Sequence, residues 1–484
     1  MGWKNIYIVV ISLLAVCLDA NAETVPDTML TRCRATGLPI LHIETVDSVM
    51  PTCEVVYPPE GCFGRSITNN EKIGGRLWIE SDGDTIYDSG IYEDKASGIT
   101  IKVRGNTSAT KGGYYGEKKP YKLKLQKKAD LLFRGNDNTY ADKDWVLLRY
   151  VICETLTGNI ANRAMQMPWT PAEKVVLLIL NGDFRGMYLL TENVKRNQDC
   201  RVNISKTGFL YEYDAYWWNA SYYIPSTQFN LNYTLKYPEE DEIKPWQEEY
   251  LTGSINQVEE AIMTPGAIDE VLDIPSFARW LWVHDVLGDG DAAGSNMFIM
   301  KYDTLSSSKT IMVCPWDFGM ACSSAQKYKW SSQHYGAWCF PQLFAMPQIS
   351  FLQEYINQYD NIAINAFDTI ANQLDSIRFS ELAAQMDKGQ VLDNERWTRY
   401  EKAPSNQLAS LATFVRERKE IVDSLMTIVK DDYLMTTSLR QSIQTNSEVM
   451  MLFDVMGRPL SKPTSDITII RYQDGTTEKR ILIK

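Results

Sequence analysis

A basic, glycine-rich loop begins at Arg104-Gly105-Asn106-Thr107-Ser108 and leads into the stretch Pro120-Tyr121-Lys122-Leu123-Lys124-Leu125. Apolar and polar residues alternate along the second stretch, which is the pattern of a β-strand with one buried face. Lys122 and Lys124 therefore share one face of this strand, opposite its apolar residues. A lysine on such a face is often simply solvated, so the role of these two depends on what surrounds them.

The same strand pattern continues on both sides of this stretch. Strands are expected at Arg76–Glu80, Thr100–Val103, Lys174–Leu180 and Phe184–Val194, the last two joined by the hairpin signal Asn181-Gly182. Trp145–Met165 interrupts them with the apolar spacing of a helix. The first half of the chain is therefore expected to be rich in β-structure.

After about residue 240 the pattern becomes mainly helical. Helices are expected over Trp246–Met263, Ile274–Leu287 and most of Phe351–Lys430, and short strands at Met297–Tyr302 and Thr310–Val313. We expect an α+β protein with a β-rich N-terminal lobe over residues 23–240 and a helical C-terminal lobe over residues 241–440. Short β patterns return in a small tail over residues 446–484.

The first 22 residues have the composition of a signal peptide. Lys4 supplies a positive charge, Ile6–Leu18 is apolar, and Ala20-Asn21-Ala22 is a small-residue cleavage pattern. A lipoprotein signal ending at Cys17 is the alternative, although Val16 is larger than the residue usual before such a cysteine. We expect an exported protein that is secreted, periplasmic or at the cell surface, without a transmembrane segment, because no later apolar run is long enough.

The composition excludes some classes of function. The net charge is −12, so no basic stripe is expected to neutralise the phosphates of a nucleic acid. The chain has only three histidines and no CxxC motif, which argues against a zinc site. An even number of cysteines follows the leader, and disulfides are possible in an exported chain, but the spacing does not fix their pairing.

Carboxylates with the spacing of a metal and nucleotide site lie in the second half of the chain. Asp291 and Asn296 form an Asp-x4-Asn pattern in a loop between an expected helix and an expected strand, and Asp317-Phe318-Gly319 follows a later strand. In phosphoryl transfer an Asp orients or deprotonates the acceptor hydroxyl, and an Asn and a second Asp hold Mg²⁺. Asp289 lies in the same loop, so Asp289 and Asp291 both stay candidates for the catalytic carboxylate.

The order of these parts along the chain matters more than any one of them. Asp, Asn and Gly are common in turns, so each pattern alone is weak. The glycine-rich loop, the lysine strand, Glu154, Asp-x4-Asn and Asp-Phe-Gly nevertheless follow one another as they do in kinases. Either Lys122 or Lys124 is expected to reach a nucleotide phosphate, and Glu154 to pair with that lysine. Together the parts predict a phosphotransferase.

Several longer stretches resemble a known family. They are Leu38–Ile40, His42–Thr45, Arg104–Ser108, Lys119–Leu125, Asp144–Leu148, Asn181–Glu192, Gly208–Glu212 and Pro315–Gly319. Over roughly residues 38–430 the chain is similar to the CotH family of atypical, spore-coat-type protein kinases. The NGxxxGxYLLxE and PWDFG stretches are the most specific of the set.

The resemblance implies a divergent, two-lobed protein-kinase-like fold that binds ATP with Mg²⁺ or Mn²⁺. It also implies transfer of the γ-phosphate to Ser or Thr of extracytoplasmic proteins. By position, Asp291, or else Asp289, would be the catalytic carboxylate, and Asn296 and Asp317 would be the metal ligands. The residues implied at the nucleotide are Arg104, Asn106 and Lys122 or Lys124 at the phosphates, Glu154 beside the lysine, and Glu192 near an interlobe hinge.

One pair of residues departs from the family's pattern. Gly158-Asn159 stands where the family usually has Arg-Asn, so an ion pair is expected to be missing there.

Some members of the family resemble adhesins, which makes a catalytically inactive surface adhesin or scaffold the alternative function. The tail, through Leu452–Leu460 and Ile481–Lys484, looks like the C-terminal sorting modules of exported Bacteroidetes proteins.

Overall fold

The computed structural model describes residues 27–68, 71–110, 118–135, 137–290, 294–328, 338–345, 348–398, 400–445, 449–453, 459–460, 467–472 and 477–481. The expected signal peptide and Asp291 lie outside these residues. The chain divides into two compact units between Lys419 and Glu420, within the long helix α13 (Pro404–Thr445).

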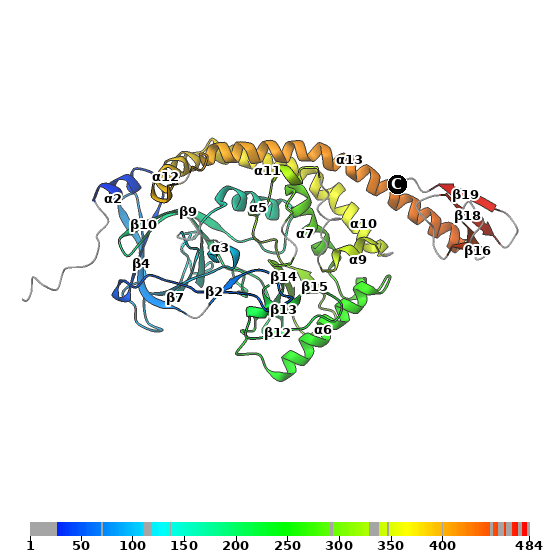
Figure 1. Ribbon diagram of the computed structural model, residues 1–484, viewed down its shortest axis with the longest axis horizontal. Helices are drawn as coiled ribbons and strands as arrows, with labels where there is room; N and C mark the ends of the chain where they lie inside the picture. The colour runs from blue at the N-terminus through cyan, green and yellow to red at the C-terminus, as the bar shows by residue number, and fades with distance from the viewer. Residues whose placement is uncertain are drawn as a thin grey trace, which may run out of the picture. The chain divides into compact units, whose positions relative to one another are not determined.

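Seven strands in the described part of the larger unit close into a barrel, whose labelled strands are seen in Figure 1. The order around the ring is β1-β9-β10-β8-β7-β6-β4, and β1 closes it by pairing in parallel with β9 and antiparallel with β4. The barrel strands are β1 (Ile40–Thr45), β4 (Ile73–Ser81), β6 (Ile99–Val103), β7 (Tyr121–Ala129), β8 (Asp142–Leu148), β9 (Glu173–Leu180) and β10 (Asp183–Glu192). Strand β5 (Asp84–Asp88) pairs antiparallel with β4, and β2 (Val55–Val56) pairs with β3 (Ser66–Ile67).

Small residues allow the barrel to close. A Cβ atom on Gly75 of β4 would lie 2.6 Å from the carbonyl oxygen of Glu44 in β1, and one on Gly98 would lie 2.7 Å from the carbonyl oxygen of Gly75. Glycine is therefore needed where the backbones approach most closely. Apolar side chains from alternate positions of the strands, among them Leu123 and Leu125 of β7, form the core of the barrel.

A second sheet of the larger unit has the order β12-β13-β11-β14-β15. Its strands are β11 (Phe209–Asp214), β12 (Tyr223–Ile224), β13 (Asn232–Tyr237), β14 (Met297–Lys301) and β15 (Thr310–Met312). Because β11 pairs with both β13 and β14, this sheet joins segments from the two sides of residue 240.

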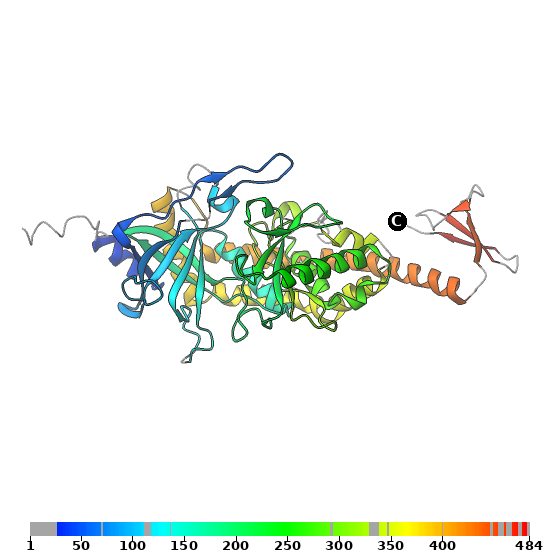
Figure 2. The same cartoon turned by 90° about the horizontal axis from the view of Figure 1, so that it is seen from below.

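Helices connect the two sheets. Helix α5 leaves the barrel between β8 and β9 and packs against α7 and α11, α7 packs against β15 and α10, and α12 packs against β10. Figure 2 shows the same elements from a second direction. The helices are α2 (Asp27–Arg34), α3 (Thr107–Thr110), α5 (Ile152–Ala164), α6 (Pro245–Met263), α7 (Ile274–Leu287), α9 (Phe340–Ala345), α10 (Ile349–Gln358), α11 (Ile364–Arg378) and α12 (Glu381–Trp397).

The predicted two-lobed protein-kinase-like fold is wrong. The N-terminal half forms a closed seven-stranded barrel followed by a helical C-terminal region, and this arrangement does not match the kinase fold. Closure depends on the pairing of β1 with two strands that are distant in sequence, which the period of each strand does not reveal. The interlobe hinge expected near Glu192 is correspondingly replaced by a continuous barrel strand, β10.

Most of the local elements agree with the sequence pattern. The hairpin at Asn181-Gly182 is confirmed, with both residues at positive φ (51° and 76°) between β9 and β10. The helix expected over Trp145–Met165 is only partly correct, because residues up to Leu148 belong to strand β8 and the helix begins at Ile152. A short buried apolar run can be a strand or a helix, and periodicity alone does not separate the two.

The smaller unit contains a sheet in its described residues, with the order β17-β16-β18-β19. Its strands are β16 (Val449–Phe453), β17 (Pro459–Leu460), β18 (Ile467–Tyr472) and β19 (Thr477–Ile481). Within the described ranges, no helix has both the length and the apolar composition required to span a membrane. The eight cysteines from Cys33 to Cys339 carry free thiols.

Candidate functional site

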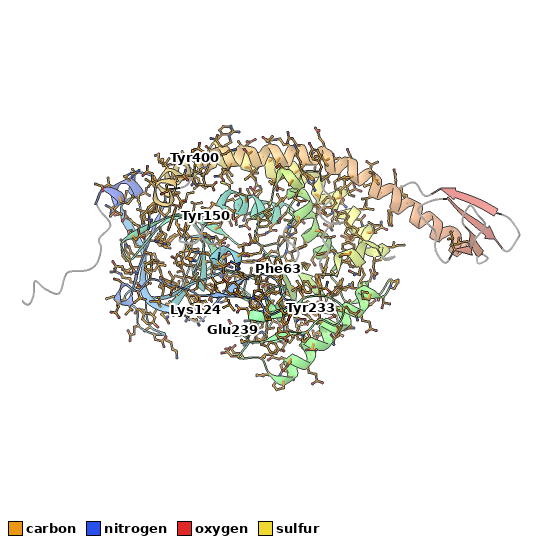
Figure 3. All side chains as sticks on the ribbon, in the orientation of Figure 1. Phe63, Lys124, Tyr150, Tyr233, Glu239 and Tyr400 are labelled. Carbon is orange, nitrogen blue, oxygen red and sulfur yellow. The ribbon has the colours of Figure 1, made fainter. Side chains whose placement is uncertain are left out.

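Strands β6 and β7 carry a row of cations on the outer face of the barrel. Lys102 of β6 lies directly across from Lys122 of β7, and Arg104 follows just beyond the end of β6. Lys124, labelled in Figure 3, is exposed and pairs with Asp144 of β8 in the register of the two strands. The residues between these lysines are buried in the barrel, which confirms the predicted division of β7 into a lysine face and an apolar face.

Arg104 connects this cationic face with acidic residues from the second half of the chain. Burial lowers the pKa of the Arg104 guanidinium, while the carboxylates of Asp317 and Glu212 act in the opposite direction. These two carboxylates therefore lie close enough to Arg104 to interact with its charge. A residue of the predicted phosphate-binding loop and a predicted metal ligand are thus brought together.

The two predicted metal ligands have unusual backbone conformations. Asn296 and Asp317 both have φ of 64°, in the left-handed region that residues with a side chain seldom adopt. The Asp317 Oδ1 atom accepts a hydrogen bond from the Gly319 N–H at 3.2 Å, and the Asp317 side chain is exposed. Such conformations often occur at ligand sites, where the surrounding structure holds them in place.

A group of polar residues on the second sheet supports Asn296. Glu212 Oε1 accepts a hydrogen bond from the Asn296 N–H at 2.7 Å, and Glu212 Oε2 forms an ion pair with Lys236 Nζ at 2.9 Å. Asp214, on the same face of β11, accepts hydrogen bonds from Ser295 Oγ at 3.1 Å and Thr234 Oγ1 at 3.0 Å. Burial raises the pKa of the Glu212 carboxyl, which Lys236 opposes.

Sequence reasoning missed these supporting residues. Glu212 and Asp214 stand two positions apart in a buried strand, which is a signal for a polar face, but their partners lie on β13 and just before β14. The pairing of β11 with β13 and β14 brings Lys236 and Asn296 to them. Because that pairing is tertiary, the local pattern does not predict it.

Lys122 has a carboxylate partner other than the predicted Glu154. Its Nζ lies 3.7 Å from Asp144 Oδ1, and Asp144 also pairs with Lys195 at 2.5 Å. Burial lowers the pKa of Lys122, and Asp144 and Glu239 oppose that shift. Asp144 is therefore shared between at least two lysines.

Glu154 lies on α5, the helix that supports the Asp-Phe-Gly segment. Burial raises the pKa of the Glu154 carboxyl. Elsewhere on α5, the Asn162 side chain donates a hydrogen bond to the Pro315 carbonyl at 3.2 Å, and a Cβ atom on Gly158 would lie only 2.1 Å from the Phe318 ring. The glycine that departs from the family's pattern thus provides the space in which Phe318 packs.

Asp289, one of the two candidates for the catalytic carboxylate, is fully buried. Its Oδ2 lies 3.2 Å from Nδ1 of His284, and its backbone N–H donates to the His284 carbonyl. The other candidate, Asp291, lies outside the described residues. Asp289 therefore has a packed position at the end of α7.

Asn106 and Glu192 have structural contacts away from the acidic residues. The Asn106 Oδ1 atom accepts a hydrogen bond from Ser66 Oγ at 2.8 Å, which attaches the loop to β3. Glu192 forms an ion pair with Arg134 at 2.8 Å and accepts a hydrogen bond from the Ala172 N–H at 2.9 Å. The assignment of both residues to nucleotide binding stays a prediction.

A comparison with known families matches residues 101–422 to the CotH kinase protein family. This match covers more than half of the chain. The chain belongs to the CotH family. None of the curated proteins matches it.

The oxygen donors at this CotH-family site suit a hard divalent cation. Asp317 supplies a carboxylate and Asn296 an amide oxygen, and Mg²⁺ is typically held by one or two carboxylates together with phosphate oxygens. Among the described residues, no group of three His, Cys, Asp or Glu could hold a metal by itself. A metal held by Asp317 and Asn296 would therefore need further oxygen ligands, such as those of a phosphate.

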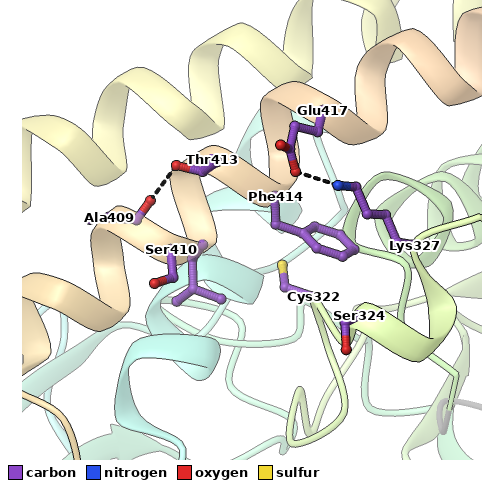
Figure 4. Close-up of a pocket in the computed structure, with 9 residues that line it drawn as sticks. Cys322, Ser324, Lys327, Ala409, Ser410, Thr413, Phe414 and Glu417 are labelled. Atoms are coloured by element: carbon purple, nitrogen blue, oxygen red, sulfur yellow. Dashed lines mark hydrogen bonds and ion pairs between the residues drawn. The ribbon is translucent and has the colours of Figure 1, made fainter.

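A separate hollow of about 440 Å³ lies between the first turns of α13 and residues 322–327. Figure 4 shows its lining, including Cys322, Phe414 and the ion pair between Lys327 and Glu417. None of the residues described above as a candidate ligand lines it. The charged groups beside Arg104, rather than this hollow, form the candidate site.

Proposed function

We propose that this CotH-family chain is an exported, ATP-dependent protein kinase that transfers the γ-phosphate to Ser or Thr hydroxyls of extracytoplasmic or surface proteins. The proposal is carried by the polar group around Arg104, in which the charges of Asp317 and Glu212 act on the guanidinium and Glu212 accepts a hydrogen bond from the Asn296 N–H at 2.7 Å. Phosphoryl transfer requires a cation at the phosphates beside carboxylates that hold a divalent metal. Arg104 and Asp317 supply this combination.

Each residue has a defined task in this proposal. Arg104, with Lys122 on the adjacent strand, binds phosphate oxygens, and Asn296 and Asp317 hold Mg²⁺ or Mn²⁺. The metal, when bound, neutralises the charge that develops on the transferred phosphoryl group. Glu212 positions Asn296 by accepting its backbone N–H.

We assign the orientation of the acceptor hydroxyl to Asp291 rather than to Asp289. A general base must come within hydrogen-bond reach of the proton that it takes. Asp289 is fully buried and lies against His284, which leaves its carboxylate poorly placed for a protein substrate. Export to the cell surface or beyond is supported by the signal-peptide pattern of residues 1–22.

Transfer of labelled γ-phosphate from ATP tests the proposal. The purified chain is incubated with Mg²⁺ or Mn²⁺ and a Ser-rich protein substrate, and label is measured on both proteins. Asp317→Asn is expected to lower the rate on the order of a hundredfold or more, because it removes a charged metal ligand. Asp82→Asn is the matched control, since Asp82 also has a positive φ (53°) but lies in the turn between β4 and β5.

The adhesin or scaffold alternative predicts a different result. If wild type and Asp317→Asn are equally silent with both metals, and ATP does not raise the unfolding temperature, the chain is not a kinase. A protein that binds ATP in its native state gains stability by mass action. Stabilisation by ATP without transfer would leave a nucleotide-binding protein and would refute the proposed phosphotransferase activity.

A further inference from the structure

Lys102 is a cation beside the candidate site that the sequence pattern did not single out. It lies on the outer face of β6, directly across from Lys122 of β7. Like charges directly opposite each other on one face destabilise a sheet. Arg104 adds a third positive charge two residues farther along the chain, just beyond the end of β6, and its charge acts on Lys122.

The charges around Lys102 come from four other elements. Lys122 on β7 and Lys72, just before β4, are the neighbouring cations, and Asp144 on β8 and Glu239, just after β13, are the neighbouring carboxylates. Asp144 is already shared with Lys122 at 3.7 Å and with Lys195 at 2.5 Å. Lys102 and Lys122 are therefore influenced by the same two carboxylates, Asp144 and Glu239.

We propose that Lys102, Lys122 and Arg104 form a ridge that binds the polyphosphate chain of a nucleoside triphosphate, with Arg104 at the terminal phosphate and the two lysines at the inner phosphates. Arg104 takes the terminal position because the charge of Asp317, a proposed metal ligand, acts on it. Two residues along a strand span about 6.6 Å, which places the lysine pair and Arg104 at successive points along an extended phosphate chain. This inference rests on the proposed kinase function and adds Lys102 to its binding residues.

The ridge makes phosphate binding dependent on pH. Burial, followed by the charges of Lys122 and Lys72, lowers the pKa of Lys102 to about 8. A bound phosphate favours the charged lysine, so binding takes up a proton wherever free Lys102 is neutral. Affinity should be highest below pH 8 and should fall as the pH rises through this value.

Binding of sodium tripolyphosphate, ATP and adenosine to the purified chain, measured by calorimetry, tests the ridge. Lys102→Gln is expected to weaken tripolyphosphate and ATP about tenfold at pH 7, since it removes one charge-assisted contact. Adenosine affinity should be unchanged. Lys128→Gln, at an exposed lysine farther along β7, is the matched control and should bind all three probes as wild type does.

Lys102→Arg isolates the titration of Lys102 from that of Lys122, whose pKa burial also lowers. Arginine stays charged throughout, so this variant should lose less tripolyphosphate affinity than wild type between pH 7 and pH 9. Equal losses in the two proteins would remove Lys102 from the pH dependence. Unliganded Lys102→Gln should also unfold at the same or a higher temperature than wild type at pH 7, because it relieves the like-charge pair.

The failure of the ridge can be distinguished from the failure of the kinase proposal. If wild type binds tripolyphosphate and ATP and Lys102→Gln binds them equally well, the ridge is refuted while the kinase proposal stands. If wild type binds neither probe, both proposals are refuted. Binding of tripolyphosphate without ATP would support the ridge as a polyphosphate site and contradict the ATP-dependent activity.

Discussion

Two lysine environments in this barrel protein differ in how their charge is balanced. Lys118 is 1% exposed, and its Nζ contacts Asp393 Oδ1 at 2.5 Å and the Met187 carbonyl at 2.8 Å. The rings of Tyr150, labelled in Figure 3, and Tyr188 lie 5.0 and 4.9 Å from the same Nζ. On the outer face, by contrast, Lys102 faces two other lysines and two carboxylates.

The difference separates a structural lysine from one that is proposed to bind a ligand. Asp393 also accepts a hydrogen bond from the Met187 N–H at 2.8 Å. The pair of Lys118 and Asp393 therefore connects α12 to β10. A buried charge that is matched in this way fixes the packing of the elements around it. Lys102 and Lys122 are instead influenced by the same two carboxylates, Asp144 and Glu239, and together with Arg104 they form the ridge that is proposed to bind an anion from outside.

Removal of the buried carboxylate should produce the largest effect. Asp393→Ala leaves Lys118 buried without this partner and is expected to lower the free energy of unfolding by about 3–5 kcal/mol, measured by urea denaturation. Replacing both partners, as in Lys118→Met with Asp393→Leu, should recover much of that loss.

The exposed pair of Arg416 and Asp375, at 2.6 Å, provides the control for this measurement. Asp375→Ala should change the free energy of unfolding by no more than about 1 kcal/mol, because water screens exposed pairs. Equal losses in Asp375→Ala and Asp393→Ala would show that the Lys118 pair has no special structural role.

A carboxylate added beside Lys102 should balance its charge more closely, as Asp393 does for Lys118. In Lys72→Glu, a cation beside Lys102 is replaced by an anion that can pair with it. We expect tripolyphosphate affinity to fall several-fold, by loss of attraction, and the free energy of unfolding to rise by less than about 1 kcal/mol. An unchanged affinity, measured by calorimetry, would contradict a functional role for the charges around Lys102.

The local pattern predicted the faces of single strands but not their partners. The alternation in Tyr121–Leu125 correctly separated buried from outward residues. The closed barrel was not predictable, because β1 finds its neighbours β4 and β9 far away in the chain. The kinase-like order of motifs instead favoured a two-lobed fold, which the structure contradicts.

In the candidate site, too, the sequence predicted individual residues better than their neighbours. The likeness to kinases pointed to Arg104 and Asp317, and the structure brings their charges together. Lys102 stood in a strand correctly predicted at Thr100–Val103, yet its neighbours are set by the register with β7 and by the segments around Lys72 and Glu239. Glu154 was expected beside a lysine because of the kinase pattern, whereas Lys122 pairs with Asp144 on the adjacent strand.

The affinity of Arg104→Gln for ATP, compared with wild type in the presence and absence of Mg²⁺, tests the central claim most directly. The account predicts that wild type binds ATP more tightly with Mg²⁺ and that Arg104→Gln loses about tenfold or more, by removal of a charge-assisted contact to phosphate. Lys128→Gln, at an exposed lysine of β7, should bind as wild type does. Equal ATP affinity in wild type and a folded Arg104→Gln variant would contradict a phosphate site beside Asp317.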